Sequence, residues 1–358
     1  MNVSLHSYRP HDAIRRGRLE LLCSGNDMNV QFINAIGRIA VKRIPTYAFA
    51  KDLIKIEKIN PETGYHDSVP FNHDMMRMRL ENIPIMNFDP GFSFLHERYW
   101  KKVDYKSPDR EIHEHEKNNK IEAYIDARNT NSEGSEVIVH VTTNDMKLTI
   151  NGDKVQLYDE KYPLLLISLK PKEAFKCSMR GVLGIGINHT CWDACSNFCY
   201  DQETIPDKTI VKFVSASRFN EFVLVDRAIE YFKLRTKTLK DEINRMYLLE
   251  KNPTERFQII IRDEDHTMGE PINYEIQSHP DISKASISKP DHLVREIVLD
   301  IVAFKKEKLL DAIMSSMDTL IKKIDKFENE FKKIKKNDSG EKKDKIEKVK
   351  SKIVKTKK

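Results

Sequence analysis

His266 is the residue whose neighbours most invite a catalytic interpretation, because it lies between Asp265 and Thr267. An imidazole beside a carboxylate can act as a general acid or base. A structural interpretation explains the same residues better. Thr267 and Glu270 have the spacing of a capping box, so we expect Thr267 to be the N-cap of a helix with acidic residues before its positive end. Pro271 removes an amide from the first turn, so the helix is expected to start late or to be irregular.

Two clusters contain metal-ligating residue types. His189, Cys191, Cys195 and Cys199 could offer an imidazole and thiolates to zinc. The cysteine spacing is unusual for a structural zinc site, and residues four apart on a strand lie about 13 Å from each other. The run 113–116, HEHE, is a second candidate, but its two histidines share a face only on a strand, and the surroundings are those of a solvated loop. We therefore predict no metal and no cofactor.

Gly181, Gly184 and Gly186 resemble a phosphate-binding loop only in composition. A dinucleotide site needs a strand before the glycines, a helix after them and a later acidic residue. The residues that follow, 188–193, do not predict such a helix, so we interpret the glycines as a structural loop at the tip of a domain. The sequence also contains no Asp-x-Asp-x-Asp triad of the kind that could hold the Mg²⁺ pair of nucleotidyl transfer. Catalytic residues are therefore predicted to be absent from this chain.

The composition predicts a globular protein with two or three domains. The chain has 358 residues, of which 39% are apolar and 32% are charged. No apolar run approaches the roughly 20 residues of a membrane span, and no signal-peptide pattern opens the chain, so we expect the cytosol or nucleus and no membrane contact. The odd number of cysteines, five, favours a reducing compartment.

The net charge of +6 comes from the end of the chain. Residues 335–358 contain eleven lysines and four acidic residues, which leaves 50 basic and 51 acidic residues in the rest. A nearly neutral body lacks the electrostatic footprint of a nucleic-acid-binding domain. The tail 335–358 is of low complexity, and we expect it to be disordered or a frayed extension of a helix. It could solubilise the protein or contact nucleic acid loosely.

Hydrophobic periodicity indicates a mixture of strands and helices. Asn151-Gly152 is a typical hairpin turn, and Pro45 ends a helix because proline disfavours a helical predecessor. Residues 86–132 are polar and irregular. Strands are predicted at 18–23, 137–141, 147–150, 164–169, 174–179 and 209–215, and helices at 29–42, 75–80 and 220–250.

Two long helices carry apolar seams. Within 220–250, and again from Leu310 to Ile334, apolar residues recur at alternating steps of three and four. Such a seam buries one face against a partner helix. Each half of the chain thus offers a strand, a turn, a helix and a final long helix, and we expect the two halves to pack together. The predicted core of this packing is Phe32, Ile36, Ile39, Ile229, Phe232, Ile243, Ile313, Met317, Leu320 and Ile324.

Four segments carry a family resemblance. Residues 257–269, FQIIIRDEDHTMG, resemble the strand–turn–helix signature of the eleventh subunit of eukaryotic RNA polymerase II, a relative of the bacterial α subunit. Residues 34–48, 78–85 and 184–192 resemble segments of the third subunit of that enzyme. The four occur in the expected order within residues 18–330. A single chain that joins both subunits resembles the fused polymerase subunit of large cytoplasmic DNA viruses.

The resemblance implies an α+β fold, an RNA polymerase α-like pseudo-heterodimer with a shared four-helix core plus an inserted β-rich domain. The implied domains are a third-subunit-like part (1–47 and 206–250), the insertion (48–205) and an eleventh-subunit-like part (251–334). The implied function is a non-catalytic assembly scaffold that bridges the two large catalytic subunits of a DNA-dependent RNA polymerase. Its expected location is the cytoplasm of an infected cell and the virion.

The resemblance also implies partners. They are the largest and second-largest polymerase subunits and a small zinc protein like the tenth subunit, with no direct specific contact to nucleic acid. Gly37 replaces the first arginine of the family's pair, and residues 86–150 lack the cysteines of the family's zinc cluster. The alternative function is a virion structural or nucleic-acid-binding protein that acts through the basic tail. The implied partner-interface residues are Asn34, Arg38, Pro45, Thr46, Asp265, His266, Thr267 and Gly269.

Overall fold

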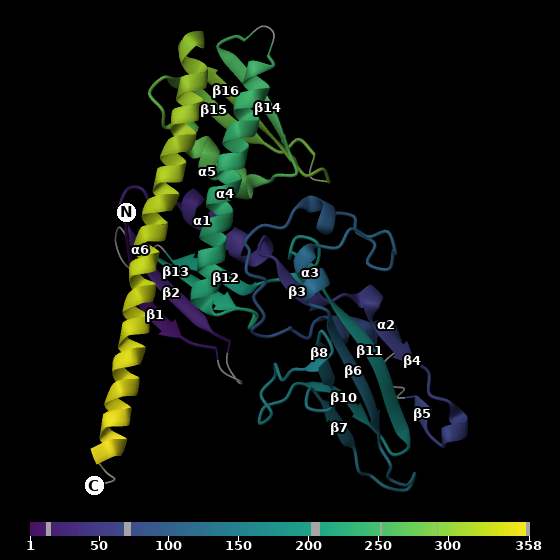
Figure 1. Cartoon of the computed structure of the whole chain (residues 1–358). Helices are drawn as coiled ribbons and strands as arrows, with labels where there is room; N and C mark the ends of the chain where they lie inside the picture. The colour runs from purple at the N-terminus through teal and green to yellow at the C-terminus, as the bar shows by residue number, and fades with distance from the viewer. Residues whose placement is uncertain (12–15, 68–72, 202–207, 251–252, 292, 356–358) are drawn as a thin grey trace.

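A four-stranded antiparallel sheet opens the fold (Figure 1). The computed structural model describes residues 1–11, 16–67, 73–201, 208–250, 253–291 and 293–355, with side chains as far as Lys336. The strand order is β1-β2-β13-β12. Alternate residues of β2 and β13 face the core, as a sheet with one buried face requires. The strands are β1 (Asn2–Arg9), β2 (Arg18–Ser24), β12 (Cys195–Asp201) and β13 (Lys208–Ser215).

The place of β12 corrects one predicted boundary. Residues 195–201 pair with β13, so they belong to the first sheet, whereas we predicted that the insertion extends to 205. The reason is that β12 reads CSNFCYD, with small and polar residues that give little strand periodicity. Two helices accompany this sheet, α1 (Val30–Lys42) and α4 (Glu221–Leu248). The side chains of Asn29 and Asn220 cap them, because each accepts a hydrogen bond from an amide of the first turn.

The second half has a three-stranded antiparallel sheet in the order β14-β16-β15 and two helices. One face of β14 consists of Phe257, Ile259 and Ile261, all buried. Helix α5 packs on this sheet, and α6 follows its last strand. The elements are β14 (Arg256–Arg262), α5 (His266–Gln277), β15 (Ile282–Ser288), β16 (Glu296–Ala303) and α6 (Lys306–Lys355). Because side chains are described only to Lys336, the character of the basic tail stays a prediction.

Four helices join the two sheets. Helix α1 packs on α4 and α5, and α6 packs on the same two helices. Each helix thus contacts the other helix of its own half and one helix of the other half. Figure 1 shows α6 running beside α4 for most of the length of α4. Phe32 of α1 lies 5.6 Å from Phe232 of α4 and 5.8 Å from Phe327 of α6, measured between ring centroids. One continuous apolar core therefore spans both halves.

The segment between α1 and β12 folds around a separate core. Its main sheet has the order β3-β11-β6-β8-β9, and β4 and β5 also pair with β11. Asn151 and Gly152 both have positive φ and close the β8–β9 hairpin, as predicted. The strands are β3 (Thr46–Phe49), β4 (Lys55–Glu57), β5 (His66–Asp67), β6 (Ile121–Arg128), β8 (Lys147–Ile150), β9 (Asp153–Lys154) and β11 (Glu173–Gly184).

Two strands and two helices complete this segment. Strands β7 (Val139–Thr142) and β10 (Leu165–Leu169) form a two-stranded sheet. The helices are α2 (His73–Glu81) and α3 (Glu114–Asn118). Strand β6 falls in the stretch 86–132 that we expected to be irregular, and this expectation was wrong for 121–128. Short 3₁₀ turns occur at η1 (Lys51–Leu53), η2 (Pro61–Thr63), η3 (Glu97–Tyr99) and η4 (Thr190–Trp192).

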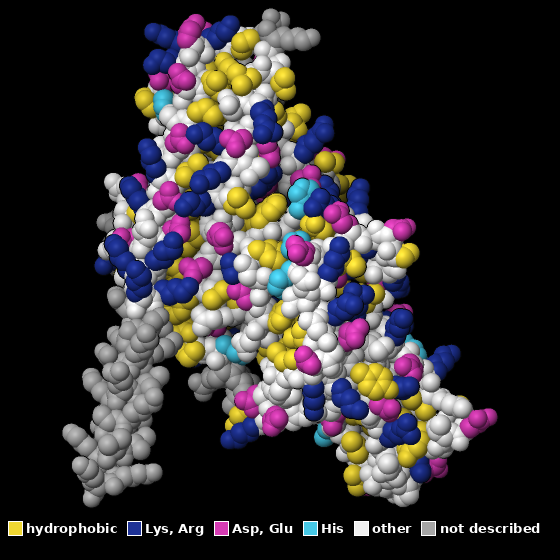
Figure 2. Space-filling model, viewed as in Figure 1, with side chains coloured by type: hydrophobic (Ala, Val, Ile, Leu, Met, Phe, Trp, Pro, Cys, Tyr) yellow, Lys and Arg dark blue, Asp and Glu magenta, His cyan; other side chains and the backbone are white. Residues whose placement is uncertain are grey.

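The distribution of charged side chains on the surface agrees with the nearly zero net charge of residues 1–334. On the face drawn in Figure 2, basic and acidic side chains are interspersed rather than separated into areas of one sign. Among the residues that the structure describes, no helix is long and apolar enough to cross a membrane.

Candidate assembly site at the junction of the two halves

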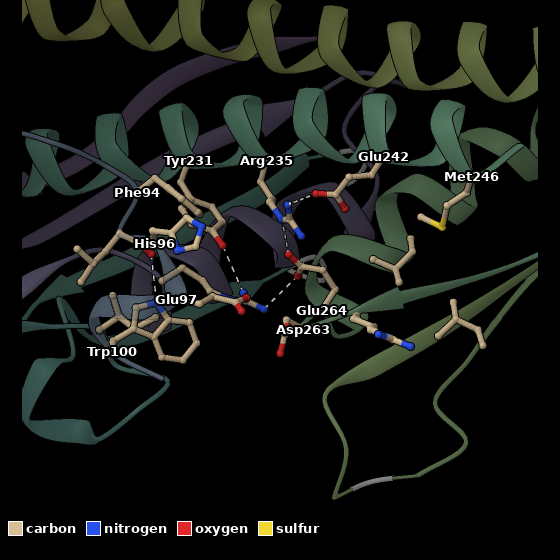
Figure 3. A pocket seen from close by; sticks show the side chains of 16 residues that line it. Phe94, His96, Glu97, Trp100, Tyr231, Arg235, Glu242, Met246, Asp263 and Glu264 are labelled. Carbon is tan, nitrogen blue, oxygen red and sulfur yellow. Dashed lines mark hydrogen bonds and ion pairs between the residues drawn. The ribbon is translucent and has the colours of Figure 1, made fainter. Parts of the chain in front are cut away.

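A cleft of about 540 Å³ lies where three parts of the fold meet (Figure 3). Arg43 comes from the end of α1, and Tyr231 and Arg235 point into the cleft from α4. The turn between β14 and α5 contributes 263–264. The segment 94–100, which belongs to the irregular stretch before β6, covers the other side. Each of the three parts therefore places polar side chains against the other two.

Arg43 is the centre of a buried ion-pair network. Its side chain is 5% exposed. Nη2 donates to Oε2 of Glu264 at 3.3 Å and to Oδ2 of Asp265 at 3.1 Å, and Nη1 donates to the Tyr231 hydroxyl at 3.3 Å. Arg235 Nε donates to the other oxygen of Glu264 at 2.6 Å. Glu264 thus accepts from both helices of the first half, and the network ties the second half to them.

The charges of this network shift the acidities of its members. Burial by itself disfavours the Asp265 carboxylate, but the Arg43 charge and hydrogen bonds from Thr267 lower the pKa of Asp265 to about 2. Burial also raises the pKa of Tyr231. Arg43 itself has a raised pKa, since its neighbours outweigh the cost of burial. All three groups therefore keep their ordinary neutral-pH charge, and the pairing is intact at pH 7.

The turn before α5 differs in detail from the prediction. Asp265, not Thr267, is the N-cap, and its Oδ1 accepts from the Thr267 amide at 2.8 Å. Glu270 does not complete a capping box but pairs with His266 at 3.1 Å. Helix α5 begins at His266 and continues through Pro271, so the expected late start was also wrong. Both Asp and Thr are good N-caps, and sequence spacing alone did not distinguish them.

The segment 88–101 fastens the inserted domain to both halves. Asp89 pairs with Arg227 of α4 at 3.0 Å. Lys101 forms an ion pair with Asp263 of the second half, and the Trp100 ring lies 6.0 Å from the Arg295 guanidinium carbon. Burial and the nearby Asp263 charge raise the pKa of Glu97. The irregular segment 88–101 therefore contacts both halves of the chain. The sequence did not indicate these contacts.

The predicted partner-interface residues divide into two groups. Asn34 and Arg38 of α1 line a second cleft of about 500 Å³ together with Asp265 and Thr267 of the second half. Arg38 is exposed, and it has no hydrogen bond or ion pair with a described residue. Residues from two halves that the sequence separates by more than 200 positions therefore share one surface groove.

The other members of that set lie inside the fold or beside the groove. Pro45 and Thr46 are buried, and the Thr46 hydroxyl donates to the Trp192 carbonyl at 2.7 Å. Gly269 is buried against β15 and β16, where an added Cβ would lie 2.1 Å from Ile287 Cδ1. His266 is partly exposed. In this chain Pro45, Thr46 and Gly269 shape the fold rather than present side chains to solvent.

All ten residues predicted for the core between the halves are buried in the shared core, none with more than 3% exposure. One register detail differs, because Leu309 rather than Leu310 is fully buried at the start of α6. The ten residues are Phe32, Ile36, Ile39, Ile229, Phe232, Ile243, Ile313, Met317, Leu320 and Ile324.

The candidate metal ligands have other partners. Burial raises the pKa of Cys191 and of Cys195 to about 12, and Cys195 Sγ lies 3.2 Å from the Val214 carbonyl oxygen. Cys199 is exposed, and His189 Nδ1 accepts from the Cys191 amide. In the described ranges, no three His, Cys, Asp or Glu side chains are grouped so that they could hold a metal ion.

The residues of the two other candidate sites take part in packing. His113 stacks on Phe92, with ring centroids 4.8 Å apart, and His115 Nδ1 lies 2.9 Å from the Tyr47 hydroxyl. Burial lowers the pKa of both histidines. Gly184 lies in β11 against the Trp192 ring, where a Cβ would meet ring atoms at 2.6 Å. These residues hold the inserted domain together.

The second half of the chain is similar to a known domain family. Residues 256–330 match the family model described as the RNA polymerase Rpb3/Rpb11 dimerisation domain. Over 304 residues, the chain is 25% identical to a protein of Acanthamoeba polyphaga mimivirus named "Putative DNA directed RNA polymerase subunit". The alignment covers 80% of this chain and 81% of that protein. The matched residues contain β14, α5, β15, β16 and α6 as far as residue 330.

Proposed function

We propose that this chain, an α-like RNA polymerase subunit related to the mimivirus protein, is a non-catalytic assembly scaffold of a DNA-directed RNA polymerase. In this proposal, the first sheet with α1 and α4 corresponds to the third-subunit-like half, and residues 256–330 are the eleventh-subunit-like half. The two halves together form a pseudo-heterodimer within one polypeptide, and the segment between α1 and β12 is an inserted β-rich domain.

The observation that carries the proposal is the single apolar core shared by α1, α4, α5 and α6. A dimerisation domain buries its helices against a second, similar domain, and here the second domain is supplied by the same chain. Covalent connection makes this association intramolecular, with an effective concentration in the mM range or higher. A rigid two-part platform of this kind can hold two large neighbours in a fixed relation.

The proposed partners are the two largest subunits of the polymerase and a small zinc protein like its tenth subunit. The groove that contains Asn34, Arg38 and Asp265 is the proposed contact surface, because residues of both halves meet there with Arg38 exposed. The proposed location is the cytoplasm of an infected cell and the virion, since the full-length relative is a viral protein.

Disruption of the shared core tests the proposal. Changing Ile313, Met317 and Leu320 to Asp places three charges in the core, where burial of an unpaired charge costs several kcal/mol each. The tagged full-length variant, co-expressed with the two large subunits, is expected to lose them in a pull-down. The matched control changes Ser315, Thr319 and Lys322 to Asp on the exposed face of the same helix.

The control variant is expected to recover both large subunits as the wild type does. Recovery of both large subunits by the core variant at wild-type levels would contradict the scaffold role. So would a wild-type chain that co-purifies with neither subunit. A direct test of the non-catalytic part of the proposal is His266→Ala, which is expected to leave the rate of nucleotide addition by the assembled enzyme unchanged.

A further inference from the structure

A cleft of about 550 Å³ lies between the first sheet and the inserted domain, and it shares no lining residue with the junction of Figure 3. One wall is apolar and includes Leu164–Leu166 from the start of β10 and Ile83 after α2. Leu165 is 47% exposed. The cationic lining residues are Arg16, Arg79 and Arg218.

Arg218 is a buried cation whose hydrogen-bond acceptors are all neutral. It is 4% exposed. Its guanidinium donates to the carbonyl oxygens of Asp193 at 3.0 Å, of Tyr47 at 2.5 Å and of Cys191. A guanidinium has five N–H groups, so two of them find no acceptor among the described residues. Burial lowers the pKa of Arg218 to about 10. The nearby Asp193 carboxylate favours the Arg218 charge, and a further anion in the cleft would offset the remaining cost of burying that charge.

The rest of the cleft does not supply that anion from its described lining. The one carboxylate there is Asp193, and its oxygens accept from Lys42 Nζ at 2.8 and 2.9 Å. Arg16 and Arg79 are exposed at the cleft. Arg79 Nη2 donates to the Leu165 carbonyl at 3.1 Å, which places its positive charge beside the apolar wall. The cleft thus combines positive charge with apolar surface.

We propose that this cleft binds an extended segment of a partner protein in which acidic side chains alternate with apolar ones. In such a segment successive side chains point to opposite sides, so carboxylates can reach Arg79 and Arg218 while apolar groups cover Leu165. Carboxylates and guanidinium groups form strong charge-assisted hydrogen bonds. The described lining contains no Phe, Tyr or Trp on which bases could stack, which favours a peptide over a nucleic acid.

The position of the cleft connects it to the proposed assembly surface. Ser196 lines both this cleft and the groove that contains Asn34 and Arg38. The inference therefore rests on the proposed function in one respect, namely that the segment belongs to another subunit of the same polymerase. The expectation that the bound segment must be acidic depends only on the residues that line the cleft.

Peptide binding to the full-length chain tests the charge requirement. The probe is a short fluorescent peptide that alternates glutamate with leucine, and binding is followed by anisotropy at several salt concentrations. Arg79→Glu and Arg218→Lys are expected to weaken binding about tenfold or more. Lys322→Glu, an exposed residue of α6, is the control because it changes the net charge as much as Arg79→Glu does. Replacing each glutamate of the peptide by glutamine is expected to abolish binding to the wild type.

Three results would overturn the inference. The first is equal affinity for the glutamate and glutamine peptides. The second is equal binding by Arg79→Glu and Lys322→Glu. The third is a duplex DNA probe that binds with a stronger dependence on Arg79 than the peptide shows, because that dependence would assign the cleft to nucleic acid.

Cross-linking in the assembled polymerase identifies the source of the segment. A photoreactive amino acid at the exposed position Leu165 is expected to capture an acidic, apolar segment of another subunit. Capture of a neutral or basic segment contradicts the inference while leaving the scaffold role intact. Failure of the chain to enter the polymerase at all contradicts the scaffold role, and the peptide measurement still decides the charge requirement.

Discussion

Nη2 of Arg43 lies 3.3 Å from Oε2 of Glu264, although 221 positions separate the two residues in the sequence. Their side chains are 5% and 2% exposed. Arg43 follows the last residue of α1 in the first half, and Glu264 lies in the turn between β14 and α5 of the second half. A buried pair of this kind is weak evidence for added stability, but it fixes the relative position of the elements that carry it. Without Arg43, Glu264 keeps only its contact with Arg235.

Replacement of Arg43 by Met is expected to lower the free energy of unfolding by about 3–5 kcal/mol, because Asp265 loses its nearest buried counter-charge and Glu264 keeps only that of Arg235. Urea denaturation measures the change. The control is Arg98→Met, which removes an ion pair with Glu111 whose side chains are 56% and 53% exposed. An exposed pair contributes about 0–1 kcal/mol. Equal stability of the two variants would show that the network does not hold the halves.

The lowered pKa of Asp265 predicts that the free energy of unfolding depends on pH. Its pKa is about 2 in the folded chain against an ordinary value of 3.8. A lowered pKa stabilises the fold fully above the ordinary value, and the contribution is lost as the pH falls toward the folded value. Asp265→Asn keeps the Oδ1 acceptor for the helix cap but removes the charge. The difference in unfolding free energy between wild type and variant is expected to be constant above pH 5 and to shrink between about pH 4 and pH 2.

Urea titrations at a series of pH values measure this difference. A gap between the two proteins that stays the same down to pH 2 would contradict the assignment of the lowered pKa to Asp265. A gap that shrinks at higher pH would point to another titrating group in the network.

Phe232 tests the core that joins the halves. Its ring is fully buried and packs on Phe32 of α1. Phe232→Ala is expected to cost about 3–5 kcal/mol through lost burial and the cavity left behind. The matched control is Phe304→Ala, because Phe304 is 65% exposed after β16 and a substitution there is expected to stay within about 0.5 kcal/mol. Thermal unfolding compares the two, and similar losses would mean that the shared core is not tightly packed.

Gly269 tests the close approach of α5 to its sheet. An Ala Cβ at this position would lie 2.1 Å from Ile287 Cδ1 and 2.7 Å from Ile297 Cδ1. Gly269→Ala is expected to destabilise the chain by about 1–3 kcal/mol, because the isoleucines must move. Gly134 has no atom within 4 Å of an added Cβ, so Gly134→Ala is the control and is expected to be neutral or slightly stabilising. A neutral Gly269→Ala would show that the packing there is loose.

The elements with strong hydrophobic periodicity could be predicted from the sequence. Helices α1 and α4 have regular apolar spacing and Asn caps, and both occur within two residues of the predicted bounds. Strands β6 and β12 were missed or misassigned. β6 reads IEAYIDAR, in which apolar and charged residues alternate as its buried and exposed residues do, so β6 could have been predicted from its own pattern although the residues around it are rich in charge. β12 reads CSNFCYD, which has no regular alternation, and its pairing with β13 places it in the first sheet.

The polar part of the site could not be predicted in the same way. Which carboxylate neutralises Arg43 depends on how the halves pack, and no local pattern records a contact across 221 positions. One signal was available. Arg43 follows a helix with a buried apolar face and precedes buried Ile44, and a charged residue among buried neighbours needs a partner.

Helix α4 ends at Leu248 and β14 begins at Arg256, and this short separation along the sequence has a consequence for synthesis. Translation delivers one copy of each half, and the second half emerges from the ribosome already attached beside the helix it must cover. Neither half is produced alone with its apolar helix face exposed to solvent. A destabilising mutation in α4 can also be compensated by a second mutation in α6 of the same gene. A genome that encodes both halves in one reading frame thereby avoids having to balance the expression of two separate genes.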